Sequence, residues 1–156
     1  MLEERMRYGK TFPEGTHALL NLGKVIKESG LEASLLELVK TRASQLNGCA
    51  YCIDMHTKDA RAAGETEQRL YALSAWRETP FFTGRERAAL AWTEAITNIQ
   101  QGHASDEVYA EARAAFDEAE LVKLTFAIAQ INMWNRIAIA SRVEVGKYQP
   151  ATHVAG

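Results

Sequence analysis

The sequence has few of the features of secreted and membrane proteins. Its 156 residues include two cysteines, too few for a framework of several disulfides, and a chain of this length can bury a core without one. No stretch approaches the roughly 18 apolar residues of a membrane span, and residues 1–7 carry charges where a signal peptide needs an apolar run. We therefore expect one cytoplasmic domain over residues 1–156, with its core between about 16 and 145.

A basic surface is also missing from the chain. The 18 Lys and Arg residues are outnumbered by 20 Asp and Glu residues, which leaves a net charge of −2, and the two signs are interleaved. Binding of nucleic acid needs a basic face or stripe that neutralises phosphates. Together with the lack of an apolar span, this predicts that neither nucleic acid nor a membrane is a partner.

The alternating apolar pattern of β-strands is absent, whereas apolar residues at helical spacing are frequent. Thr83 and Glu86 have the spacing of a capping box, and Asn47-Gly48 is a typical left-handed helix end. We expect an all-α domain of about seven helices, over residues 17–29, 32–47, 49–63, 66–76, 83–99, 105–116 and 118–145.

The last of these predicted helices is apolar on more than one face. A helix of this kind is covered on two sides, and a neighbouring subunit is a natural second cover. Asn132, Asn135 and Arg136 interrupt it, and as buried polar groups they need partners within the subunit or across an interface. We expect a homo-oligomer in which the arms at residues 1–13 and 147–156 are ordered only by a neighbouring subunit.

Three reactive side chains, Cys49, Cys52 and His56, lie within eight residues. The two cysteines fall on the first turn of a predicted helix, within disulfide reach, where free N–H groups and the helix dipole stabilise a thiolate. His56 follows Cys52 by one helical turn on the same face, where an imidazole can accept the thiol proton. We expect this imidazole to face the surface, outside the core.

Glu37 lies on the preceding predicted helix. A return of the chain at Asn47-Gly48 could bring its carboxylate to His56, where it would orient the imidazole and tune its basicity. The dipole alone favours Cys49 as the more acidic thiol because it is nearest the helix start, whereas the position of His56 favours Cys52.

Several other interpretations of the cysteine pair are weaker. A structural zinc site needs four ligands, and Cys49, Cys52 and His56 supply three. A c-type haem needs a histidine directly after the second cysteine, where Ile53 stands. Two inert core cysteines remain an alternative, because free Cys is often a small core residue. We predict no metal ion and no cofactor.

The ordered pattern Glu37, Cys49, Cys52, His56 resembles that of the AhpD-like alkylhydroperoxidases in the carboxymuconolactone decarboxylase superfamily. The resemblance covers about residues 16–145 and is supported by Arg42, Asn47-Gly48, the segment 85–90 and Asn135-Arg136. It implies an all-helical fold that assembles as a trimer or hexamer and reduces hydroperoxides through a dithiol/disulfide cycle.

The resemblance also implies a role for each site residue. Cys52 corresponds to the cysteine that attacks the peroxide, Cys49 to the one that resolves the sulfenic acid, and Glu37 with His56 to the proton relay. Related proteins carry a second histidine where this chain has Tyr51, and a phenol is no base near neutral pH. The relay is therefore expected to rest on Glu37 and His56 alone.

We thus predict a thiol-dependent peroxidase that acts on small organic hydroperoxides. By the same resemblance, its reductant is a lipoyl-bearing or thioredoxin-like protein. Two alternatives stay open: a decarboxylase that acts on a carboxylated lactone, whose chemistry has no use for a cysteine pair, and a redox-sensing oligomer without enzymatic activity.

Overall fold

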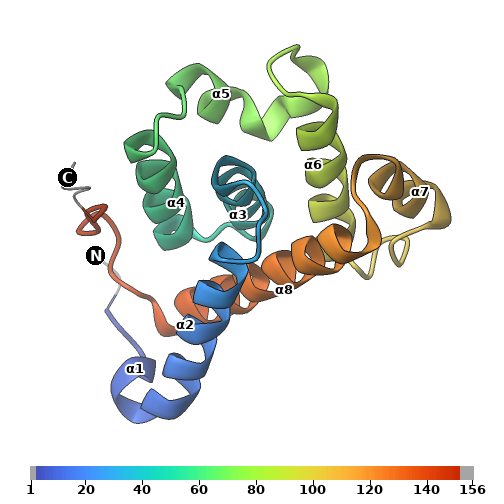
Figure 1. The fold of residues 1–156 in the computed structure, drawn as a ribbon. Coiled ribbons are helices and arrows are strands. Elements are labelled where there is room, and N and C mark those ends of the chain that lie inside the picture. The colour runs from blue at the N-terminus through green and yellow to red at the C-terminus, as the bar shows by residue number, and fades with distance from the viewer. Residues whose placement is uncertain (1–2, 152–156) are drawn as a thin grey trace.

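The computed structural model describes residues 3–151, and these form eight α-helices and one 3₁₀ helix, η1 (Figure 1). No strand is present in that range, so the predicted all-α fold class is confirmed. None of the helices is both long enough and apolar enough to pass through a bilayer, within the part of the chain described. In chain order the elements are α1 (Tyr8–Thr11), α2 (Pro13–Lys27), α3 (Ala33–Asn47), α4 (Ala50–Ala62), α5 (Glu67–Ala72), η1 (Leu73–Glu78), α6 (Gly84–Thr97), α7 (Asp106–Ala115) and α8 (Glu118–Ser141).

Helix α3 lies at the centre of the fold and packs against α4, α6 and α8 (Figure 1). It can do so because its leucines and valine occupy two faces. Val39 packs in a cluster with Leu124 and Ile128 of α8, whereas Leu38 packs with Leu90 of α6. Each of these side chains is fully buried, which stabilises the fold by about 1.5–3 kcal/mol apiece.

The chain turns sharply between α3 and α4. Gly48 ends α3 in the left-handed region with φ 68°, as predicted from Asn47-Gly48, and its N–H bonds to the carbonyls of Gln45 and Ser44. A residue with a Cβ adopts this φ only at a cost, so glycine favours the turn. Helix α4 then returns along α3, which places its first turn beside the end of α3.

The start of α2 and the end of α8 differ from those predicted. Helix α2 begins at Pro13, before residue 17, because proline at the first helical position already has the helical φ. Helix α8 ends at Ser141, before residue 145, because Arg142 turns to φ 54° and its N–H bonds to the carbonyls of Ala138 and Ile139. The predicted capping box of Thr83 and Glu86 is confirmed.

The two arms are held by contacts within the chain. The N–H of Arg5 donates to the carbonyl of Ser141 at 2.9 Å, and the Tyr8 ring lies 6.1 Å from that of Trp134. The Tyr148 hydroxyl donates to Asp59 Oδ1 at 2.7 Å. The expectation that only a neighbouring subunit orders the arms is therefore wrong for residues 3–13 and 147–151, and residues 1–2 and 152–156 lie outside the described part.

Candidate active site

Cys49 and Cys52 form a disulfide at the start of α4, with their Cα atoms 5.4 Å apart. Cys49 is the N-cap residue, and its sulfur accepts the N–H of Cys52 at 3.3 Å. Both side chains are buried, in a small cluster with Ala43 of α3 and Ile131 of α8. The cysteine pair therefore lies on the first helical turn, as its spacing predicts.

A network of asparagines holds the turn that precedes the cysteines. The Asn47 amide donates to the side-chain oxygens of Asn132 and Asn135 on α8, at 2.9 Å in each case. Asn135 is fully buried and donates to Ser44 Oγ at 3.0 Å, while Asn132 donates to Thr97 Oγ1 at 3.0 Å. The polar interruption of α8 thus finds its partners within the chain, which was one of the two expectations.

The return of α4 along α3 brings Glu37 to His56. His56 Nδ1 lies 2.9 Å from Glu37 Oε2, and Lys40 donates to Glu37 Oε1 at 3.1 Å. Burial raises the pKa of the Glu37 carboxyl, but the hydrogen bond from His56 and the charges of His56 and Lys40 outweigh it, so the pKa lies below its usual value of 4.5. An ionised carboxylate only accepts, so Nδ1 carries a proton and Nε2 of the neutral ring is the basic atom.

His56 itself is buried, with 7% of its surface exposed. The expectation that it faces the surface is wrong, because α4 packs this face against α3. Burial gives the imidazole a fixed position relative to Cys52, which precedes it by one turn on the same helix face.

The structure adds two residues that sequence reasoning missed. Asp59, one turn beyond His56, and Tyr148 of the C-terminal arm form a hydrogen bond beside Glu37. Burial raises the pKa of the Tyr148 phenol, and the hydrogen bond to Asp59 raises it further, so the phenol stays protonated. No sequence motif predicts the contact between Asp59 and Tyr148, because the two residues are far apart in sequence.

Glu37, His56 and Asp59 offer ligand atoms within 4.8 Å of one another, a group that could hold a metal ion. Most of these atoms already have partners in the protein: His56 bonds to Glu37, and Asp59 accepts from Tyr148. Those hydrogen bonds are sufficient to explain why the three residues meet. The cysteines do not belong to this group among the residues described.

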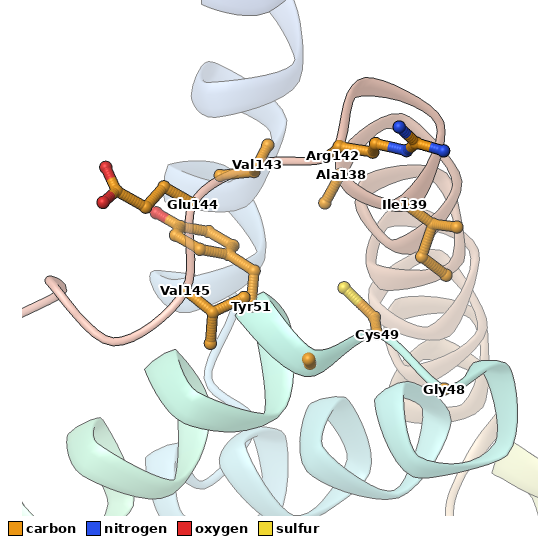
Figure 2. Close-up of a pocket in the computed structure, with 10 residues that line it drawn as sticks. Gly48, Cys49, Tyr51, Ala138, Ile139, Arg142, Val143, Glu144 and Val145 are labelled. Atoms are coloured by element: carbon orange, nitrogen blue, oxygen red, sulfur yellow. The ribbon is translucent and has the colours of Figure 1, made fainter. Parts of the chain in front are cut away.

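Two cavities of about 350 Å³ each flank the disulfide. The first, which we call the Cys52 cavity, is lined by Cys52 and His56. The second, the Cys49 cavity, is lined by Cys49 and by the segment after α8, and in Figure 2 the Cys49 sulfur points into it towards α8. Tyr51 and Ala138 line both cavities. Each cysteine therefore lines a cavity of its own.

The arginines that support the resemblance have structural partners. Arg42 forms an ion pair with Glu94 at 2.9 Å, and Arg85 bridges Glu32 at 2.7 Å and Glu120 at 2.8 Å. These ion pairs join α3 to α6 and α6 to α8. They hold the helices that carry the site and do not line either cavity.

The sequence profile of the carboxymuconolactone decarboxylase family matches residues 13–95, a span that contains all four predicted site residues. The uncharacterized protein YdfG of Bacillus subtilis is 47% identical over 139 residues, which cover 89% of this chain and 95% of YdfG. The uncharacterized protein YnjA of Escherichia coli is 29% identical over 107 residues, which cover 69% of this chain and 58% of YnjA.

Solved structures show the same fold. A protein of unknown function from Agrobacterium tumefaciens, described as a candidate AhpD antioxidant defence protein, superposes with a TM-score of 0.90 at 42% identity, over 94% of this chain and 100% of its own. The debrominase Bmp8 superposes with a TM-score of 0.80 at 23% identity, over 89% of this chain and 74% of its own. The second likeness is one of fold alone.

Proposed function

The chain belongs to the AhpD-like group of the carboxymuconolactone decarboxylase family, and from this premise we propose that it is a thiol-dependent peroxidase that reduces small organic hydroperoxides. The observation that carries the proposal is the Cys49–Cys52 disulfide beside an imidazole held by Glu37. Such a pair can store and release two electrons, and the imidazole can move the accompanying proton.

In the first step, reduced Cys52 attacks the outer oxygen of the hydroperoxide. His56 Nε2 takes the thiol proton, the thiolate forms a sulfur–oxygen bond, and the oxygen–oxygen bond breaks. The proton passes from His56 to the departing alkoxide, which leaves as an alcohol. Cys52 becomes a sulfenic acid and the substrate has gained two electrons. Ionised Glu37 stabilises the imidazolium that forms in between.

In the second step, the Cys49 thiol attacks the sulfenic sulfur of Cys52. The hydroxyl leaves as water with the thiol proton, and the two cysteines form the disulfide that the structure contains. An external dithiol, on a lipoyl-bearing or thioredoxin-like protein, then reduces the disulfide and is itself oxidised. This cycle suits the cytoplasm, where such reductants keep thiols reduced.

Turnover with a dithiol tests the proposal directly. We expect the protein to consume cumene hydroperoxide in the presence of dihydrolipoamide, with one dithiol oxidised per peroxide. Cys52→Ser should abolish consumption, whereas Cys49→Ser should allow a single turnover that stops at the sulfenic acid. Absence of turnover in the wild type, with the disulfide still forming, would favour the redox-sensing alternative.

Mass spectrometry separates the roles of the two cysteines. Reduced wild-type protein treated with one equivalent of peroxide should lose two hydrogens as the disulfide forms. An oxygen adduct on Cys52 with Cys49 still a free thiol would contradict the resolving role of Cys49.

Decarboxylation of a carboxylated lactone by a Cys49→Ser, Cys52→Ser double variant would favour the decarboxylase alternative, which has no use for the pair.

A further inference from the structure

The Cys52 cavity is mostly apolar. Helices α2, α4 and α8 contribute Leu20, Met55, Ile131 and Trp134 to its walls, and Tyr8 of α1 stands beside Trp134. Its volume of about 350 Å³ is near the lower end of the range for pockets that enclose small organic ligands. Hydrogen peroxide gains nothing from such walls, because it has no apolar surface to bury.

A glycine stands where α2 passes α8 at one side of this cavity. A Cβ at Gly23 of α2 would lie 2.7 Å from the side-chain nitrogen of Gln130, which donates to the carbonyl of Leu19 at 3.1 Å. The absence of a side chain at Gly23 lets α2 approach α8 closely there. Lys27 follows Gly23 by one helical turn, on the same face of α2, and lines the cavity.

The charge of the Cys52 cavity has one sign. None of its described lining residues is an Asp or a Glu, and two are lysines, Lys27 and Lys40. Lys40 is paired with Glu37 at 3.1 Å. Lys27 has no ion-pair partner within residues 3–151, so its ammonium is available to a ligand. The Cys49 cavity differs, because Arg142 and Glu144 bring both signs to it.

We infer that the Cys52 cavity selects hydroperoxides with a compact apolar body and a carboxylate, and that Lys27 is the residue that recognises the carboxylate. The apolar walls would bury the body, and the peroxide group would face Cys52 and His56. This inference rests on the proposed peroxidase function and names the substrate class of the same site.

A matched pair of peroxides tests the selection. Cumene hydroperoxide and its para-carboxylate carry the same hydroperoxide group and differ by one carboxylate on the ring. We expect kcat/KM of the wild type to favour the carboxylate by about fivefold, near the upper end for a partly exposed ion pair, and the preference to shrink as salt is added. Lys27→Gln should remove the preference and Lys27→Arg should restore it.

Lys24→Gln is the matched control, because Lys24 lies on the same helix, is exposed and does not line the cavity. This variant should keep the wild-type preference. Equal kcat/KM for the two peroxides in the wild type, or a preference that survives in Lys27→Gln, would overturn the inference while leaving the peroxidase function intact.

Binding of unreactive ligands tests the ligand class separately from the peroxidase function. Calorimetric titration of the oxidised protein should show 4-isopropylbenzoate binding about fivefold more tightly than 4-isopropylbenzamide, with the difference lost in Lys27→Gln and kept in Lys24→Gln. If neither peroxide is turned over, the proposed function fails. The titration still tests whether the cavity prefers a carboxylate, and equal binding of the acid and the amide overturns that preference.

Discussion

His56 is the single residue on which the proposed chemistry depends most. Its Nδ1 is bound to Glu37, so the ring cannot rotate freely and Nε2 is the atom left for proton transfer. In the proposed cycle Cys49 and Cys52 carry the electrons, whereas His56 carries the proton. The pair Glu37 and His56 should therefore behave in kinetics as one unit.

Replacing His56 with Ala is expected to slow peroxide reduction by about 10²–10⁴-fold, the usual loss for a general base. Glu37→Gln should give a smaller loss, and the double variant should be no slower than His56→Ala alone. The measurement is the rate of peroxide reduction, together with the rate of Cys52 alkylation by iodoacetamide against pH. In His56→Ala the midpoint of that alkylation profile should move to higher pH.

Because His56 is buried, loss of fold must be distinguished from loss of the base. His56→Gln retains an amide that can reach Glu37, so it should remain folded by circular dichroism and still show the kinetic loss. An alkylation profile of His56→Ala that overlays the wild type would mean that the histidine is structural, and the relay would be wrong.

The lowered pKa of Glu37 predicts how stability responds to acid. The folded-state pKa lies below the ordinary value of 4.5, so the carboxylate contributes its full stabilisation above about pH 4.5 and loses it as pH falls through the folded value. The free energy of unfolding in urea should therefore fall on acidification below that pH, and the fall should be smaller in Glu37→Gln. An equal fall in both proteins would assign the acid sensitivity to other carboxylates.

At the level of elements, α8 holds the turn between α3 and α4 through its asparagines. Asn135→Ala removes a fully buried amide and leaves Asn47 and Ser44 each short of a partner. We expect a loss of about 1–3 kcal/mol in the free energy of unfolding, measured in urea. Asn21→Ala, at an exposed position of α2, is the control and should change it by less than about 0.5 kcal/mol. Equal effects of the two changes would contradict the role of the network.

At the level of the whole molecule, α8 presents an apolar face that residues 3–151 of one chain leave uncovered. Val122, Phe126 and Met133 lie on one side of the helix and are 52%, 55% and 51% exposed. Clusters of exposed apolar side chains are typical of subunit interfaces. The predicted homo-oligomer, a trimer or hexamer by the family resemblance, remains a prediction with this face as its candidate interface.

Phe126→Arg places a charge in the middle of that face and should lower the mass found by light scattering to that of one chain. Tyr71→Arg serves as the control, because Tyr71 is 77% exposed on α5, away from α8, and should leave the mass unchanged. A wild-type protein that is monomeric at micromolar concentration would rule out the assembly.

Much of the fold follows from local rules. Helical spacing, the Thr83 capping box and Gly48 predict most helices to within a few residues, because backbone hydrogen bonds and φ preferences act over one turn. The errors also have local causes. The start of α2 at Pro13 was missed although proline favours that position, and so was the capping box of Asp117 and Glu120 that begins α8.

The sequence by itself determined that the chain is helical and that Cys49, Cys52 and His56 share the first turns of one helix, because residues three or four positions apart on a helix lie on one face. Only the tertiary structure decided that Glu37 reaches His56, that Asp59 meets Tyr148, and that each cysteine lines its own cavity. Those contacts join residues 19 and 89 positions apart. They depend on how whole helices cross, which is set by the packing of the core rather than by any local pattern.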